Sequence, residues 1–172
     1  NKNDFILSLG SVSPKVGSEL SGKAFWSVVS ALVLILFYIS VRFEFRFALG
    51  AILALVHDVV ITLGIFSLTG FEITLSTVAA FLTIVGYSLN DTIVILDRIR
   101  ENMKSSGTVM FESTINKSIN QSLSRTLITS LTTLFVIIVL LIYGGEVLRP
   151  FSFTMLVGVI IGTYSSIYIA SA

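Results

Sequence analysis

The chain has 172 residues, of which 54% are hydrophobic and only 12% are charged. Soluble domains carry about 25% charged residues, so this composition excludes an ordinary soluble fold and favours a chain that lies in a bilayer. The net charge of +1 argues against nucleic acid as a partner. The absence of cysteine excludes disulfides, and with a single histidine it excludes a cysteine–histidine zinc site. We therefore expect no metal and no cofactor.

The first 21 residues are mixed and polar. They contain the short apolar run Phe5-Ile6-Leu7 and then a Ser-Pro-Lys-Val-Gly segment that predicts a turn. They hold no long apolar run of the kind found in signal peptides, and the chain begins at Asn1 rather than at a methionine. We expect residues 1–21 to be the end of an extracytoplasmic domain with its linker, and the chain to be a fragment of a longer protein.

Five apolar stretches follow, each near the length of about 20 residues that a helix needs to cross the hydrocarbon. They cover residues 24–41, 47–69, 73 to about 96, 126–143 and 151–170. Their apolar residues are continuous rather than alternating, which favours helices over membrane strands. The sequence therefore predicts an all-α membrane protein in which residues 22–172 form a bundle of five transmembrane helices.

The links between these stretches indicate the orientation of the chain. Basic residues gather in the first and third links: Arg42, Arg46, Arg98, Arg100, Lys104 and Lys117. The other two links are short and hold Glu72 in one, and Glu146 with Arg149 in the other. Lysine and arginine prefer the cytoplasmic side, so we expect the first and third links and the C-terminus in the cytoplasm.

One segment outside the spans is amphipathic. Its apolar residues recur every fourth position, at Phe111, Ile115, Ile119, Leu123 and Leu127, and therefore share one helix face. We expect a cytoplasmic helix over about residues 108–124 that bends into the fourth span or runs straight into it. The alternative is a plain interfacial helix that only anchors the chain.

Asp91 lies inside the third span, next to Asn90. A charge at the bilayer centre costs about 2.5–3.5 kcal/mol on insertion scales, so such residues usually face the bundle interior and pair with another group. Loss of water disfavours the charged carboxylate and a nearby arginine favours it. These opposing effects can place its protonation where an ion gradient drives it. Asp91 is thus a candidate ion-coupling residue; a structural hydrogen bond between helices is the alternative.

Three other ionisable residues in or at the spans leave two roles open. Arg125 begins the fourth span on a polar face, and it is either an interfacial arginine that reaches the head groups or the partner of Asp91. His57 and Asp58 are adjacent in the second span, where helix geometry points them about 100° apart. Asp58 is either a second relay carboxylate or a buried acceptor that holds the bundle together.

Two further patterns favour structural roles. Gly158 and Gly162 form a Gly-x-x-x-Gly pattern in the last span, which is typical of closely packed membrane helices. The charged cluster at the cytoplasmic edge of the third span, Asp97, Arg98, Arg100 and Glu101, has spacings that allow pairs three and four residues apart. We interpret it as a solvated cluster that sets the topology.

The polar run of the third span closely resembles the signature of the SecF family of bacterial protein-export membrane subunits. That signature covers residues 86–94 (GYSLNDTIV) and 97–102 (DRIREN). The resemblance continues at residues 16–20, 42–44, 57–59, 123–130, 144–145 and 151–152. It covers nearly everything after about Pro14, with one departure, a serine at position 13 where relatives have glycine.

The resemblance implies a fold and a function. SecF-like proteins have a six-helix half of the resistance-nodulation-division type, of which this chain would hold the second to sixth helices. They pair with SecD in the bacterial inner membrane, assist the SecYEG channel, SecA and YajC, and use a proton or sodium gradient to pull polypeptide outward. Asp91 and Arg125 match the family's residues for ion transport. From the sequence itself, Asp58, Asn90 and His57 are possible additional residues of the site.

The sequence contains no phosphate loop and no pairing of a nucleophile with a base, so we expect no enzyme activity and a gradient as the source of energy. Two other functions are open. One is a scaffold subunit that conducts no ions and only stabilises its partners. The other is a proton-coupled exporter of small molecules on the same fold, which would need a substrate pocket in a large outside domain.

Overall fold

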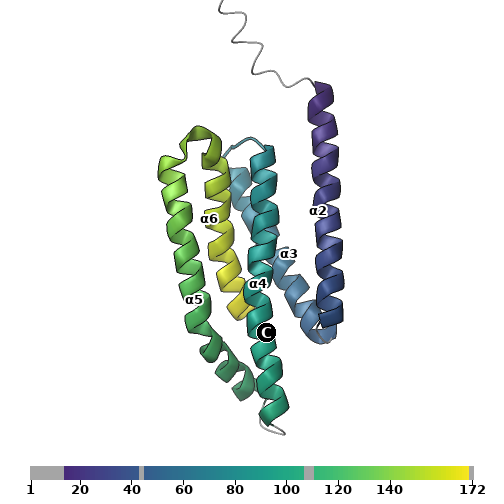
Figure 1. Ribbon diagram of the computed structural model, residues 1–172, viewed down its shortest axis with the longest axis vertical. Coiled ribbons are helices and arrows are strands. Elements are labelled where there is room, and N and C mark those ends of the chain that lie inside the picture. The colour runs from purple at the N-terminus through teal and green to yellow at the C-terminus, as the bar shows by residue number, and fades with distance from the viewer. Residues whose placement is uncertain (1–13, 43–44, 107–110, 171–172) are drawn as a thin grey trace, which may run out of the picture.

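Five helices make up the part of the chain that the computed structural model describes, which is residues 14–42, 45–106 and 111–170. They are α2 (Pro14–Arg42), α3 (Phe45–Leu68), α4 (Leu75–Ser106), α5 (Phe111–Tyr143) and α6 (Gly145–Tyr168). Figure 1 shows them as an upright bundle in which consecutive helices run up and down. The predicted all-α class is confirmed. The run Phe5-Ile6-Leu7 lies outside the described residues.

Four of the helices have the length and composition of membrane spans. Their apolar segments are Phe47–Leu68, Leu75–Lys104, Glu112–Tyr143 and Gly145–Tyr168, with mean hydropathies of 2.2, 1.6, 2.4 and 1.5. At 1.5 Å per residue even 22 residues extend roughly 33 Å, more than the roughly 30 Å of hydrocarbon. Many large apolar side chains on these helices are exposed, including Leu131, Phe135 and Val139, as expected where lipid surrounds the protein. The chain is therefore a multi-pass membrane protein.

The helix α2 lies at the edge of the bundle (Figure 1). It begins at Pro14, so the predicted turn is wrong for residues 14–17, and Ser13 lies outside the described residues. Proline is favoured at the first position of a helix, where its missing N–H is not needed. Its apolar segment, Val29–Val41, is shorter than those of the other helices. Ile39 is fully buried in an apolar core with residues of α3 and α4, whereas Trp26 and Leu34 are exposed. The lower end of α2 therefore attaches it to the bundle.

Two tight turns reverse the chain at the upper end of the bundle. Gly70, between α3 and α4, has a φ of 70°, and Gly145, at the start of α6, has a φ of 72°; glycine adopts such values without strain. Because Gly144 and Gly145 suffice for the second turn, α6 begins at Gly145 itself. The helix therefore includes Glu146, Arg149 and Pro150, which the sequence placed in a link or at its edge.

The helix α6 packs against α3, α4 and α5. Eight of its residues are buried, and six of them are glycine, serine or threonine, the small residues that let membrane helices approach closely. A Cβ atom at Gly158 would overlap the side chain of Ile84 on α4. A Cβ atom at Gly162 would lie 3.2 Å from the Cβ atom of Ser88 on the same helix. The Gly-x-x-x-Gly pattern thus marks where α6 lies against α4.

The helix α5 is continuous from Phe111 to Tyr143, so the amphipathic segment runs straight into the span and does not lie along the membrane surface. Its small polar residues at every fourth position are buried: Thr114, Ser118, Ser122, Thr126 and Ser130. Ile115 and Ile119 pack, partly buried, against the lower apolar core. The lower parts of α4 and α5 pack together and extend below the ends of α3 and α6 (Figure 1).

Candidate functional site

Asp91 lies on α4 and is only 3% exposed. Its Oδ2 atom is buried and accepts no hydrogen bond from any described residue. Buried polar atoms almost always have a partner, so an exception of this kind calls for an explanation such as a bound proton or ion. The neighbouring Asn90 is exposed, which places it on a different side of α4. The structure therefore does not bring Asn90 to the carboxyl group of Asp91.

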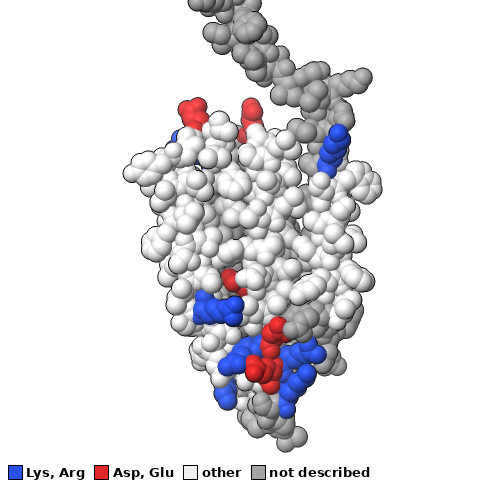
Figure 2. All heavy atoms as spheres, viewed as in Figure 1, with Lys and Arg blue, Asp and Glu red and all other residues white. Residues whose placement is uncertain are grey.

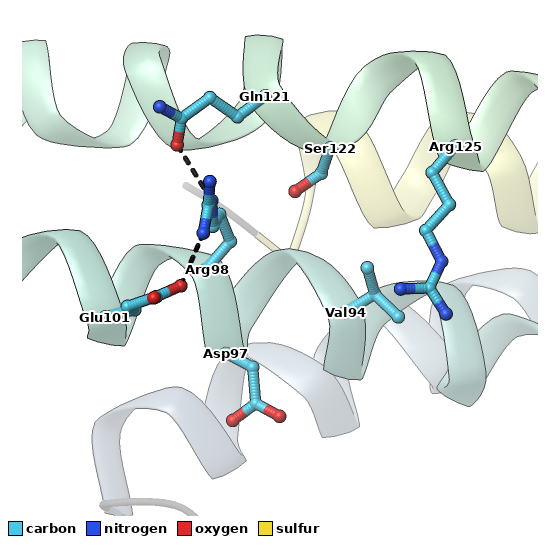
Figure 3. Close-up of a pocket in the computed structure, with 7 residues that line it drawn as sticks. All are labelled: Val94, Asp97, Arg98, Glu101, Gln121, Ser122 and Arg125. Atoms are coloured by element: carbon cyan, nitrogen blue, oxygen red, sulfur yellow. Dashed lines mark hydrogen bonds and ion pairs between the residues drawn. The ribbon is translucent and has the colours of Figure 1, made fainter.

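Arg125 and Ser130, both on α5, lie within interaction range of the Asp91 carboxyl group. Arg125 acts on it through its charge, but within the described ranges no ion pair joins the two side chains. Figure 3 shows the side chain of Arg125 extending from α5 past Val94 of α4. The arginine is thus close enough to influence the carboxyl group and is not locked to it.

A polar cavity of about 340 Å³ lies between α4 and α5, between Arg125 and the C-terminal part of α4 that carries Asp97, Arg98 and Glu101 (Figure 3). Its lining includes Arg125, Ser122, Asp97, Arg98, Glu101, Gln121 and Val94. Arg98 is held inside it, because its Nε donates to Gln121 Oε1 at 2.8 Å and its Nη1 lies 2.5 Å from Glu101 Oε2. The cavity thus connects the neighbourhood of Arg125 to the charged cluster at the end of α4, with the i,i+3 pair that the sequence allowed.

Asp58 on α3 is a second buried carboxylate, with no exposed surface. Its Oδ2 accepts a hydrogen bond from Ser88 Oγ on α4, and its Oδ1 lies 3.1 Å from Nδ1 of the partly exposed His57. Gly162 of α6 packs beside it. Both oxygens of Asp58 therefore have partners, whereas Asp91 retains an oxygen without one. The two buried carboxylates therefore differ in their hydrogen bonding, and Asp91 is the one with an unpartnered oxygen.

Sequence analysis missed a chain of hydroxyl groups beside Asp91. Tyr87 OH on α4 donates to Ser130 Oγ at 3.3 Å, and Ser130 Oγ lies 2.7 Å from Thr163 Oγ1 on α6. Three other hydroxyl residues of α5 behave differently: Thr129, Thr132 and Thr133 donate to backbone carbonyls of their own helix. The four-residue spacing from Ser118 through Thr126 was the available signal for Ser130.

Comparison with known proteins assigns the chain to a family. The sequence model described as "Protein export membrane protein SecD/SecF, C-terminal" matches residues 1–172. The chain belongs to the SecD/SecF family. Among curated relatives, the protein translocase subunit SecF of Calditerrivibrio nitroreducens is 55% identical, over 98% of this chain and 57% of its own length. SecF of Rhodothermus marinus is 54% identical, over 96% of this chain and 56% of its own.

A solved member of the SecD/SecF family has the same fold. The crystal structure of SecDF from Thermus thermophilus, a translocon-associated membrane protein, superposes with a TM-score of 0.89 at 51% identity, and the match covers 93% of this chain and 22% of that one. The SecDF sequence from that organism is 50% identical over 97% of this chain. The chain thus spans a little over half the length of the SecF relatives it matches first.

Within the described residues, no group of three His, Cys, Asp or Glu side chains gathers as a metal site. The chemistry available at Asp91 is therefore that of a single buried carboxyl group, one nearby guanidinium group and several hydroxyl groups. These groups are suited to binding and releasing a proton or a small monovalent cation. They provide no nucleophile–base pair of the kind that covalent catalysis needs.

Proposed function

We propose that this chain is the membrane part of a protein-export subunit that uses an ion gradient to assist the translocation of polypeptides. The names of its relatives, protein translocase subunits SecF and SecDF, support the export role. The observation that carries the gradient-driven mechanism is the unpartnered oxygen of Asp91, buried in a membrane helix and within reach of Arg125.

The proposed partner is SecD, because the relative from Thermus thermophilus combines both names in one chain as SecDF. The SecYEG channel, SecA and YajC are further proposed partners, and the emerging polypeptide is the cargo. The location is the bacterial inner membrane, and residues 1–21 end an extracytoplasmic domain that would move with the bundle.

The charge distribution supports the proposed orientation. Figure 2 shows charged atoms gathered at the two ends of the visible face, with a broad and mainly white band between them. The end of α4, which carries Arg98 and Lys104, and the start of α5, which carries Lys117, lie at the lower end in Figure 1. Because basic residues mark the cytoplasmic side, we place this end, and with it the C-terminus, in the cytoplasm.

The mechanism follows from the two forms of Asp91. A proton that enters from outside neutralises the carboxyl group and removes its attraction for Arg125, so that α4 and α5 no longer favour the same arrangement. Release of the proton toward the polar cavity restores the charge and the attraction. A gradient of 100 mV is worth about 2.3 kcal/mol per charge, which is enough to shift a two-state equilibrium with a gap of a few kcal/mol.

Export into inverted membrane vesicles tests this function. Vesicles that contain the full-length protein and its partner are compared with and without an ion gradient, with Asp91→Asn as the test variant. Glu112→Gln, an exposed carboxylate at the start of α5, is the matched control. Loss of only the gradient-dependent export in Asp91→Asn supports the proposal. Full gradient-dependent export in that variant would make Asp91 structural and the chain a scaffold.

A further inference from the structure

The hydroxyl chain beside Asp91 joins three helices. It runs from Tyr87 on α4 through Ser130 on α5 to Thr163 on α6. Ser130 is 3% exposed, and it is the member of the chain that lies within interaction range of the Asp91 carboxyl group. A change in the protonation of Asp91 can therefore affect the contact between α5 and α6 through Ser130.

The hydrogen atoms of these hydroxyl groups can be assigned. Each hydroxyl has one hydrogen to donate and two lone pairs to accept. Thr163 Oγ1 donates to the backbone carbonyl of Val159 at 2.7 Å, so in the 2.7 Å contact with Ser130 it can only accept. Tyr87 donates to Ser130. The single hydrogen of Ser130 is therefore available either to Thr163, 2.7 Å away, or to the Asp91 carboxyl group, which is also within hydrogen-bonding range of Ser130, while Asp91 Oδ2 has no partner.

A charged Asp91 competes for that hydrogen. Hydrogen bonds to an ionised carboxylate are roughly twice as strong as bonds between neutral groups, so the carboxylate takes the hydrogen of Ser130. Thr163 then either loses its bond to Ser130 or turns its own hydrogen from Val159 to Ser130. In both cases the contact between α5 and α6 changes when Asp91 gains or loses a proton.

We propose that Ser130 is a positioning residue that passes the protonation state of Asp91 to α6 by directing its one hydroxyl hydrogen to either Asp91 or Thr163. This inference rests on the proposed function. Arg125 on α5 is the charged group that acts on Asp91, α3 carries the buried Asp58, and α6 has no charged residue after Arg149. Thus Thr163 senses Asp91 through hydrogen bonding and not through a charge of its own.

Gradient-dependent export is measured for Ser130→Ala, Thr163→Val and the double variant, in the full-length protein with its partner. We expect each single variant to lose about twofold to tenfold, the factor that one buried hydrogen bond contributes to an equilibrium. The double variant should lose no more than the worse single variant, because both changes break the same bond. Ser130→Thr keeps the hydroxyl group and should retain most of the activity.

The controls separate this inference from its foundation. Thr133→Val removes a hydroxyl group that bonds to its own helix, and it should leave export unchanged. Gradient-independent export should stay at the native level in every variant. Normal gradient-dependent export in Ser130→Ala, or single losses that multiply in the double variant, would overturn the inference while leaving Asp91 intact. If gradient-dependent export is normal in both Asp91→Asn and Ser130→Ala, the proposed function itself is overturned. If Ser130→Ala does not accumulate, Ser130→Cys, a weaker donor, replaces it with the same expectation.

Discussion

Substitution of Gly158 by alanine tests how closely α6 lies against α4. The added Cβ atom would overlap three side-chain atoms of Ile84. Ile84 is 1% exposed and belongs to an apolar core with Ala80, Met155 and Val159, so it has no free space into which to rotate. Overpacking of this kind typically costs about 1–3 kcal/mol, and we expect Gly158→Ala to lower the free energy of unfolding by that amount.

Removal of the obstacle provides the internal control. Ile84→Ala alone should cost about 2–5 kcal/mol, as for other buried isoleucines. In the double variant the new methyl group occupies part of the space that Ile84 leaves. The double variant should therefore lose less free energy of unfolding than the two single variants lose together. The measurement is unfolding of the full-length protein by detergent titration in mixed micelles. Costs that add within about 0.5 kcal/mol, the range for independent sites, would refute the close approach.

Four further changes follow from individual contacts. Asp58→Ala should destabilise the protein by about 1–3 kcal/mol, because it leaves the hydroxyl group of Ser88 buried without its acceptor; Asp58→Asn, which keeps an acceptor, should cost less in the same titration. Arg125→Lys should retain part of the gradient-dependent export that Arg125→Gln abolishes, because the influence on Asp91 depends on charge and not on a fixed pair; equal losses would contradict this. Arg98→Ala should change the free energy of unfolding by less than about 1 kcal/mol, because its pair with Glu101 is well exposed. Gly145→Ala should cost about 1–2 kcal/mol, because alanine is strained at positive φ; a thermal shift equal to that of Val147→Ala, an exposed position in the same helix, would argue against strain.

The helical class and the spans were predictable because lipid imposes a length. A run of about 20 apolar residues has few alternatives to a membrane helix, so four of the five stretches agree with α3 to α6 along most of their length. The ends were less predictable. The helix α4 continues to Ser106, beyond its apolar run, because Asn102 donates to Ser118 and Gln121 of α5 at 2.8 and 2.9 Å. Hydropathy contains no information on such contacts between helices.

The site was predictable only in part, for a related reason. A charge in a membrane helix is costly wherever it lies, so Asp91 and Asp58 both stood out in the sequence. Whether such a carboxylate has a partner depends on residues far along the chain: Ser88 is 30 positions from Asp58. Ser130 and Thr163 gave a weaker signal still, because hydroxyl residues are common in membrane helices and most of them bond to their own backbone.

The two buried carboxylates differ in the helices that they join and in the bonds that surround them. Asp58 links α3 to α4 through Ser88, beside the close approach of Gly162 on α6, and both of its carboxyl oxygens have partners. Asp91 faces α5, where the bonds that cross to α5 and α6 at its level run between neutral hydroxyl groups. These bonds are individually weak and can exchange donors without leaving a buried charge unpaired. A change of charge at Asp91 should therefore shift α5 relative to its neighbours, while α3 and α4 keep their arrangement relative to each other.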